Sequence, residues 1–283
     1  MPMGFVDVVH PSLFGAPSDT FRWRMGVRAT DRAQWLQPDD LRTDDLREKA
    51  DLRRRWPDET FVALPGSEAA AAEVRDLVAA DLVDRGLASV PAGVGPRHPL
   101  DAAGCSVQED LCLMEQLDGA WTMTAASVCF PTRWDVPAKL GRSLAEIHAP
   151  VPGYDEHLGR QVDRFFDRMS PGVIASRLNW SLVDDPSRRL GPHEPQAPAR
   201  VPDHIGDQLF VRVERQTLRR LTGHEAVVFG IRVHVWPLNG VAAQLPAASF
   251  ADELERIPID VAHYKDLDGI RPMVVAWLRS FTG

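Results

Sequence analysis

The fold is decided by the two stretches QLFVRVERQTL (residues 208–218) and AVVFGIRVHVW (residues 226–236). In each stretch, apolar side chains alternate with polar or small ones over most of the length, which is the period-two pattern of a β-strand with one buried face. The short segment LTGH (residues 221–224) separates them. The two stretches therefore predict a long antiparallel hairpin.

Further strands and helices are predicted before and after this hairpin. Asp118-Gly119 is a turn signal between two strand-like stretches, and apolar periodicity with cap and proline signals indicates the helices. The predicted strands are Gln108–Met114, Trp121–Phe130 and Val173–Val183, and the predicted helices are Asp39–Trp56, Ser67–Val83, Lys139–His148, 157–169 and Ile270–Phe281. Helices and hairpins follow one another in blocks, without the strand–helix alternation of a doubly wound sheet, so the predicted class is α+β.

The chain is expected to form a single domain over residues 1–283. Residues 1–22 are rich in Pro, Gly and Ser and are expected to form an extended arm, and the Gly- and Pro-rich loop at 86–100 is the best internal boundary. The expected parts are an arm with a helical layer (1–96), a core (97–240) and a C-terminal helical segment (241–283).

Composition limits the class of partner and the compartment. The net charge of −8 argues against a nucleic-acid partner, because neutralising phosphates needs a basic surface. The 3 cysteines form no CxxC pair, which disfavours a disulfide framework or a Cys-rich metal site, and no CxxCH motif is present to attach a haem covalently. The N-terminus lacks a signal-peptide pattern and no apolar run is long enough to span a membrane, so we expect a cytoplasmic protein.

The common catalytic motifs for nucleotides, zinc proteases and serine hydrolases are absent, and one histidine stands out instead. Leu140, Leu144 and His148 recur at intervals of 4 and would share one helix face, with Gly141 there to let a flat ligand come close. A helix-borne histidine that points into a cavity is the geometry of a proximal haem ligand. The alternative is a core histidine that is hydrogen-bonded near the end of its helix.

Polar side chains on the predicted strands form a second group of candidates. Alternation puts Arg212 and Glu214 on one face of their strand, and Arg232 and His234 on the polar face of the returning strand. They are either the solvent side of an antiparallel sheet or the lining of a ligand cavity, where Arg and Glu hold a small charged substrate. Asn179 breaks the apolar pattern of an earlier strand and either lies over a cofactor or binds local backbone groups.

At these residues the sequence resembles a known family, the haem-dependent oxidative N-demethylases. The segments that carry the resemblance are RWRMGV (22–27), LPGSEA (64–69), HPLD (98–101), QEDLCLM (108–114), CFPTRW (129–134), IHAPVPGY (147–154), LNWS (178–181) and RVERQTLRRL (212–221). The most specific of them is the segment around His148. Their order and spacing span about residues 20–240.

The resemblance implies a PAS-like antiparallel sheet with flanking helices and an N-terminal helical extension, binding haem b with its iron. It implies the oxidation of a small amine with O2, as in the conversion of dimethylamine to methylamine and formaldehyde. The electrons would come from a separate flavin and iron–sulfur reductase, since this chain has no visible motif for either group. Carried over by position, His148 becomes the proximal ligand. The other carried-over candidates are the catalytic residues Glu214, Arg232 and His234 and the distal or substrate-pocket residues Asn179, Arg212 and Gly230.

One departure from the family pattern bears on the substrate. Where relatives tend to read Phe-Thr-Ile-Arg-Thr-Tyr, this chain reads FGIRVH (229–234), so Gly230, Arg232 and His234 share a strand face. If that face lines the pocket, a larger amine would fit beside Gly230, and His234 would act as a general acid or as an alternative iron ligand. The other interpretations are a haem-based gas sensor without turnover and a different haem-catalysed nitrogen oxidation in a biosynthetic pathway.

Overall fold

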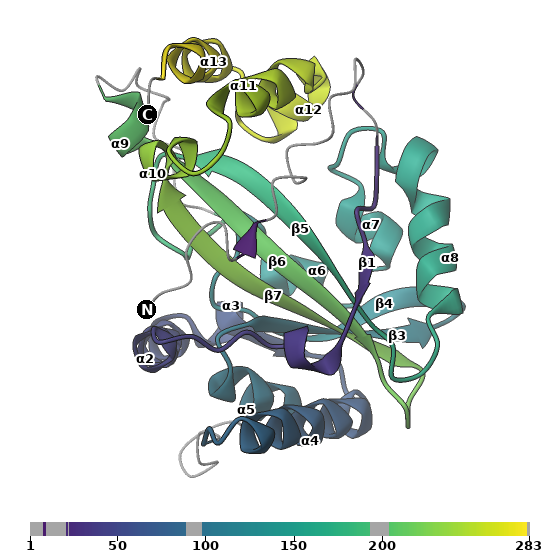
Figure 1. Cartoon of the computed structure of the whole chain (residues 1–283). Coiled ribbons are helices and arrows are strands. Elements are labelled where there is room, and N and C mark those ends of the chain that lie inside the picture. Colours follow the sequence, from purple (N-terminus) through teal and green to yellow (C-terminus); the bar gives the residue numbers. More distant parts are fainter. Residues whose placement is uncertain (1–7, 10–20, 22, 89–97, 193–203, 282–283) are drawn as a thin grey trace.

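The computed structural model describes residues 8–9, 21, 23–88, 98–192 and 204–281 (Figure 1). The arm expected over residues 1–22 and the boundary loop expected over 86–100 lie largely outside these residues. Among the described residues, 7 strands form one sheet in the order β1-β5-β6-β7-β3-β4-β2, and every neighbouring pair is antiparallel. The predicted α+β class with an antiparallel sheet and flanking helices is confirmed.

The long hairpin predicted from the sequence is the centre of the sheet. Its strands pair from Phe210 with Pro237 to Arg220 with Val227. The strands of the sheet are β1 (Arg28–Thr30), β2 (Phe61–Ala63), β3 (Asp110–Leu117), β4 (Ala120–Ser127), β5 (Ile174–Val183), β6 (Phe210–Arg220) and β7 (Ala226–Pro237). Asp118 and Gly119 form the turn of the second hairpin with φ of 49° and 81°, values that suit the two-residue turn predicted there.

Five strands form a contiguous block whose order differs from their order in the chain. If β3 to β7 are renumbered 1 to 5 in chain order, their order across the sheet is 2-1-5-4-3. Three short α-helices and the π-helical turn η3 (Asp155–Gly159) lie between β4 and β5 in the chain. The α-helices are α6 (Val136–Lys139), α7 (Leu144–His148) and α8 (Arg160–Arg168). The chain therefore leaves the sheet after β4, builds one helical layer and returns as β5.

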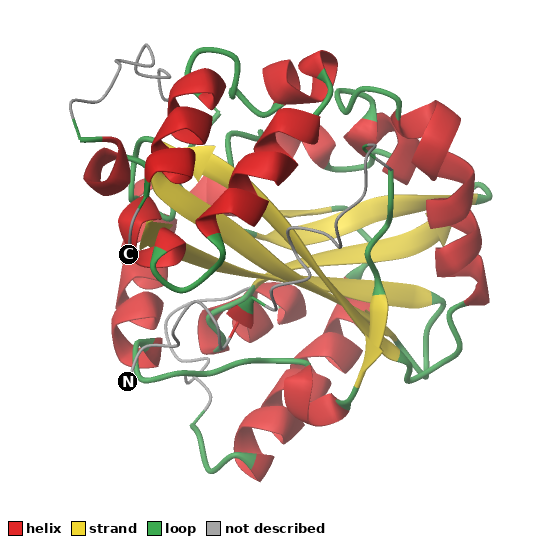
Figure 2. Ribbon diagram, turned by 45° about the horizontal axis from the view of Figure 1, so that its top comes forward, coloured by secondary structure: helices red, strands yellow, loops and turns green. Residues whose placement is uncertain are grey.

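The two faces of the sheet are covered by different helices (Figures 1 and 2). Residues that lie directly opposite each other on antiparallel strands point to the same side. Asn179 pairs with Glu214, and both lie on what we call the α7 face. Arg215 pairs with Arg232, and both lie on the opposite side, which we call the α4 face.

Apolar side chains bind a helical layer to each face. On the α7 face, Val136, Leu144 and Phe166 from α6, α7 and α8 pack on sheet residues such as Met114 and Val227. The α4 face has two clusters, one under α4 (Glu68–Asp84) and α5 (Pro99–Ser106) and the other under α10 (Leu238–Ala242), α11 (Ala247–Arg256), α12 (Ile259–Tyr264) and α13 (Arg271–Ser280). Each cluster removes apolar surface from water, which is the main stabilising contribution to such a fold.

The remaining helices are short or lie at the edges of the sheet. They are the 3-10 turn η2 (Arg32–Gln34), α2 (Arg42–Arg55), α3 (Pro57–Thr60) and α9 (Ile205–Gln208). Of these, α2 contacts β7 through polar side chains, because its Asp45 pairs with Arg232. No helix of the described residues has the length and apolarity to cross a membrane.

One predicted helix is wrong in its extent, and its error affects the candidate ligand. The sequence pattern predicted a helix over Lys139–His148, whereas the chain turns at Gly141, with φ of 74°, and α7 starts at Leu144. Ser143 caps α7 with Glu146 in a capping box, in which each side chain bonds to the backbone N–H of the other. Leu140 and Gly141 therefore do not lie on the helix that carries His148, so the predicted stripe does not exist.

Candidate functional site

His148 is the last residue of α7 and is held in one tautomer by its own helix. Its Nδ1 lies 2.8 Å from the carbonyl oxygen of Leu144, and because a carbonyl only accepts, Nδ1 carries the proton. Nε2 therefore keeps its lone pair. Metal-binding histidines commonly have this arrangement, in which the second ring nitrogen donates to a carbonyl.

The surroundings of His148 keep its ring neutral. Burial, opposed by the Leu144 hydrogen bond and aided by the charges of Arg177 and Lys139, lowers the pKa of His148. Tyr154 stacks on the imidazole with 4.6 Å between ring centroids and 8° between planes. The Tyr154 hydroxyl is buried and has no hydrogen-bond partner in the part of the chain that the structure describes. A neutral imidazole is the form of histidine that binds metals.

Glu214 lies on the α7 face among neutral hydrogen-bond donors. Thr132 donates to its Oε1 at 2.5 Å, while Gln216 and Asn179 donate to its Oε2 at 2.9 and 3.4 Å. An ionised carboxylate has about four lone-pair positions. These donors fix the orientation of the Glu214 carboxylate and leave it one position for a further donor.

Arg212 supports this arrangement from the same strand face. It is fully buried, and its Nε donates to the Thr132 hydroxyl at 2.8 Å. Its other nitrogens donate to the carbonyl oxygens of Phe130 and Ser187, at 2.9 and 3.3 Å. Arg212 thus holds Thr132 in position to donate to Glu214, and its own hydrogen-bonding capacity is largely used by the protein.

Two further cations reach the same region, and the sequence interpretation missed both. Arg177 is on β5, two residues before Asn179 on the same face, and its positive charge lies close enough to lower the pKa of His148. Lys265 follows α12 and donates to the carbonyl oxygen of Trp180 at 2.6 Å and to Asn179 Oδ1 at 3.5 Å. Strand alternation could have found Arg177, whereas no local pattern marks Lys265.

The predicted site residues fall into two groups on opposite faces of the sheet. Asn179, Arg212 and Glu214 lie together on the α7 face, and the charge of Arg177 reaches both Glu214 and His148. The register pairs Arg232 with Arg215 and His234 with Val213, so both lie on the α4 face with Gly230. The three carried-over catalytic candidates therefore lie on opposite faces, Glu214 on the α7 face and Arg232 and His234 on the α4 face.

On the α4 face, Arg232 belongs to a closed network of charges. It is 1% exposed and pairs with Asp39 at 3.2 Å and Asp45 at 3.0 Å. Gln108 donates to both carboxylates, and Arg188 pairs with Asp45 at 2.5 Å. Burial opposes ionisation of Asp39, but the Gln108 hydrogen bond and the Arg232 charge hold its pKa below the usual value.

His234 lies beside this network and is buried without a partner for Nε2. Its ring stacks on Trp236 with 5.1 Å between centroids. Burial and the Arg232 charge lower the pKa of His234 to about 3, only partly opposed by Asp39 and Asp45. A histidine of this kind is neutral across the physiological pH range.

The space next to Gly230 is filled by the protein. A Cβ at this position would lie 2.8 Å from Thr217 Oγ1 and 3.8 Å from Leu111 Cδ2. The expectation that a larger amine fits beside Gly230 is therefore wrong. The glycine accommodates the Thr217 side chain that faces it across the β6–β7 ladder.

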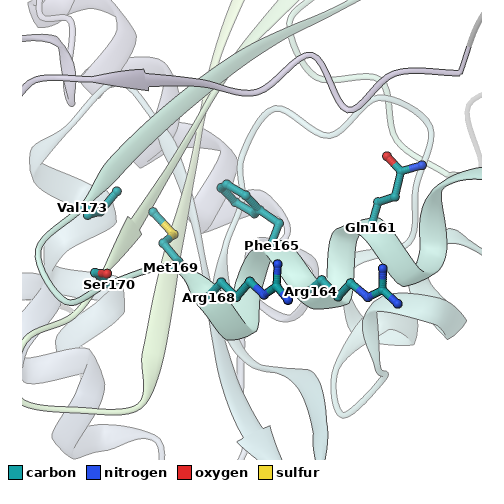
Figure 3. A pocket seen from close by; sticks show the side chains of 7 residues that line it. All are labelled: Gln161, Arg164, Phe165, Arg168, Met169, Ser170 and Val173. Carbon is teal, nitrogen blue, oxygen red and sulfur yellow. The ribbon is translucent and has the colours of Figure 1, made fainter.

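A shallow cleft at the C-terminal end of α8 is separate from these groups (Figure 3). It is lined by Gln161, Arg164, Phe165, Arg168, Met169, Ser170 and Val173. None of the candidate site residues lines it. Its lining side chains are apolar ones, two arginines, a glutamine and a serine, and they include no carboxylate or histidine that could act as an acid or base.

The described residues form no cluster that could hold a bare metal ion. No group of three or more His, Cys, Asp or Glu side chains in the described ranges is arranged to hold a bare metal ion. A haem needs only one or two protein ligands, because the porphyrin supplies four nitrogen donors. His148, with its fixed tautomer, meets that smaller requirement.

A comparison with family models identifies the chain. The model described as haem-dependent oxidative N-demethylase, alpha subunit-like, matches residues 87–275. The match covers strands β3 to β7 and the helices between them. The matched residues include His148, Glu214 and Lys265.

Proposed function

Because the chain belongs to the haem-dependent oxidative N-demethylase, alpha subunit-like family, we propose that it binds haem on the α7 face and demethylates a small amine. In balanced form, the N-methyl amine, O2, two electrons and two protons give the demethylated amine, formaldehyde and water. The electrons come from a separate flavin or iron–sulfur protein. Haem, when bound, supplies the activation of oxygen and the oxidation of the N–CH3 group.

The residues around His148 fit a haem in three respects. The Nδ1–H bond to Leu144 leaves the Nε2 lone pair for iron, and burial keeps the ring neutral. Tyr154 Oη and Arg177 Nε are buried polar atoms without a partner among the described residues, and buried polar atoms are usually satisfied by protein, water or a ligand. The strand order 2-1-5-4-3, with helices between the second and third strands, is the arrangement we expect of a PAS-like fold, in which a helix carries the ligand.

Glu214 binds and orients the amine in this proposal. At neutral pH small aliphatic amines are protonated, and the unused lone-pair position of Glu214 accepts one N–H of such an ammonium. Asn179, Gln216 and Thr132 hold the carboxylate in one orientation while it does so. Glu214 is then placed to take up the ammonium proton that must leave before the nitrogen is oxidised.

Arg232 and His234 receive no catalytic role in this proposal, because they lie across the sheet from Glu214. The observation that supports the proposal most is that a neutral, tautomer-fixed His148 and a hydrogen-bonded Glu214 lie on the same side of the sheet. The charge of Arg177 reaches both side chains.

Replacing Glu214 by Gln tests the proposal. Gln keeps the size of the side chain but cannot accept the ammonium proton, so formaldehyde release should fall about 100-fold or more. The haem absorption spectrum and the urea midpoint should stay close to those of the wild type. The measurement is formaldehyde released from a panel of N-methyl amines by haem-loaded protein supplied with an electron donor.

Glu225→Gln is the matched control, because that carboxylate is 86% exposed on the β6–β7 turn and lies outside the site. It should release formaldehyde at the wild-type rate. Equal turnover of Glu214→Gln and the wild type would contradict the role of Glu214. A wild type that binds haem and O2 but demethylates no amine would favour the gas-sensor interpretation instead.

A further inference from the structure

Arg177 is a half-buried cation that contacts no carboxylate of the described residues. Its Nε is buried and has no hydrogen-bond partner among those residues. Within the described part of the chain its guanidinium forms no ion pair with a carboxylate, although the charge of Glu214 acts on it from further away. Removing part of a charged group from water without a partner is unfavourable, so an anion from a ligand would be stabilised beside this guanidinium.

Lys265 is a second cation in the same region whose contacts are neutral. Its Nζ donates to the carbonyl oxygen of Trp180 and the side-chain oxygen of Asn179, and it lies 5.4 Å from the centre of the Trp180 ring. Burial lowers the pKa of Lys265 to about 8, with the charge of Glu214 opposing the shift and that of Arg177 adding to it. No described carboxylate forms an ion pair with Lys265.

More deeply buried cations of this chain are satisfied in two ways, by carboxylates or, as at Arg212 and Arg215, by neutral oxygen acceptors. Lys49, 1% exposed, lies 3.4 Å from Asp110, and Arg232 pairs with Asp39 and Asp45. On the α7 face, Glu214 is the carboxylate whose charge acts on both Arg177 and Lys265, and neutral donors occupy most of its lone pairs. This region therefore carries positive charge in excess of its fixed anions.

We propose that Arg177 and Lys265 form a subsite on the α7 face that binds a carboxylate from a ligand. Two carboxylates could fill it, namely a propionate of the haem or the carboxylate of a zwitterionic amine such as an N-methyl amino acid. Arg suits this function because its planar guanidinium donates two parallel hydrogen bonds to a carboxylate. The second source rests on the proposed function, because it extends the amine at Glu214 to one that also carries an acid group.

The propionate source is tested by comparing haem with haem dimethyl ester, in which both propionates are uncharged. Each is titrated into apoprotein and followed by the Soret band, for the wild type, Arg177→Gln, Lys265→Gln and the exposed control Arg160→Gln. If the subsite holds a propionate, the wild type and control should bind haem about tenfold more tightly than the ester, since one charge-assisted contact is worth at least that factor. The two subsite variants should lose the preference, and Arg177→Lys should recover part of it.

The substrate source is tested on the same haem-loaded proteins with N-methylglycine and dimethylamine as probes. If the subsite holds the substrate carboxylate, N-methylglycine should shift the Soret band at a concentration about tenfold lower than dimethylamine, and the subsite variants should abolish the difference. The urea midpoint of each variant verifies that it is folded. Either preference, when lost in the variants, supports the subsite and identifies its source.

The inference is overturned if the wild type shows neither preference, or if both substitutions leave the preferences intact. A wild type that takes up no haem contradicts the proposed function but not yet the subsite. In that case acetate is titrated into the apoprotein by calorimetry. Binding that Arg177→Gln and Lys265→Gln abolish supports the subsite, and no binding overturns it.

Discussion

The two faces of the sheet carry arginines in contrasting environments. On the α4 face, Arg232 is in contact with Asp39 and Asp45, and Gln108 completes the network. On the α7 face, Arg177 of β5 contacts no carboxylate of the described residues, and Glu214 is held by neutral donors. The α4 network balances its charges within the protein, whereas on the α7 face the proposal assigns that role to a ligand.

The largest effect is expected from breaking the network on the α4 face. Arg232→Met leaves two buried carboxylates without their shared cation, so the free energy of unfolding should fall by about 3–5 kcal/mol. Urea unfolding measures it, and Arg55→Met on the exposed side of α2 is the control, with an expected change of about 0.5 kcal/mol or less. A loss below about 1 kcal/mol for Arg232→Met, together with altered amine turnover, would mean that Arg232 belongs to the active site after all.

Acid should destabilise the α4 face through His234. Burial first, and then the Arg232 charge, hold the folded-state pKa at about 3, whereas the unfolded chain has the ordinary value of about 6.5. Below pH 6.5 the unfolded chain therefore takes up a proton that the folded chain refuses, and stability falls as the pH drops toward 3. At pH 5 the loss from this residue is about 2 kcal/mol.

His234→Gln isolates this contribution, because Gln does not titrate. The stability of the variant should decline less between pH 7 and pH 5 than that of the wild type, as urea unfolding at each pH will measure. Parallel declines of the two proteins would show that His234 is protonated in the folded state, which would return it to the list of acid–base candidates.

A smaller effect is expected at Gly230, and it tests whether this position is packing or pocket. Gly230→Ala places a methyl group 2.8 Å from Thr217 Oγ1, so it should cost about 1–3 kcal/mol by overpacking. Adding Thr217→Ala should restore most of the loss, because it removes the hydroxyl that the methyl group meets. A Gly230→Ala variant of unchanged stability that rejects larger amines would contradict the packing interpretation.

Local sequence patterns were sufficient to predict most of the strands and the longer helices. The alternation in 208–218 and 226–236 and the Asp118-Gly119 turn predicted both hairpins, because strand period and turn chemistry are local properties. The prediction for α7 was wrong because apolar spacing continued through Gly141, while the backbone there has positive φ and Ser143 starts a new helix. The cap signal Ser143-x-x-Glu146 was present in the sequence and outweighs the spacing.

The site could be predicted only in part, because faces of different strands are related by register. Alternation correctly put Glu214 and Arg212 together, but the ladder pairs Arg215 with Arg232, so an even-numbered residue of β6 faces an odd-numbered residue of β7. A slip of one residue would have placed Glu214 and Arg232 side by side. Lys265 reaches the site by packing of a distant helix end against β5, which no local pattern encodes.

The most direct test of the account is the absorption spectrum of the protein expressed with a haem precursor, for the wild type, His148→Ala and His234→Gln. The account predicts a Soret band in the wild type and in His234→Gln. The band should be lost or shifted in His148→Ala, and added imidazole should restore it by replacing the missing ligand. An unchanged band in His148→Ala would exclude His148 as the ligand, and loss of the band in His234→Gln would place the haem on the α4 face; either result would contradict the account.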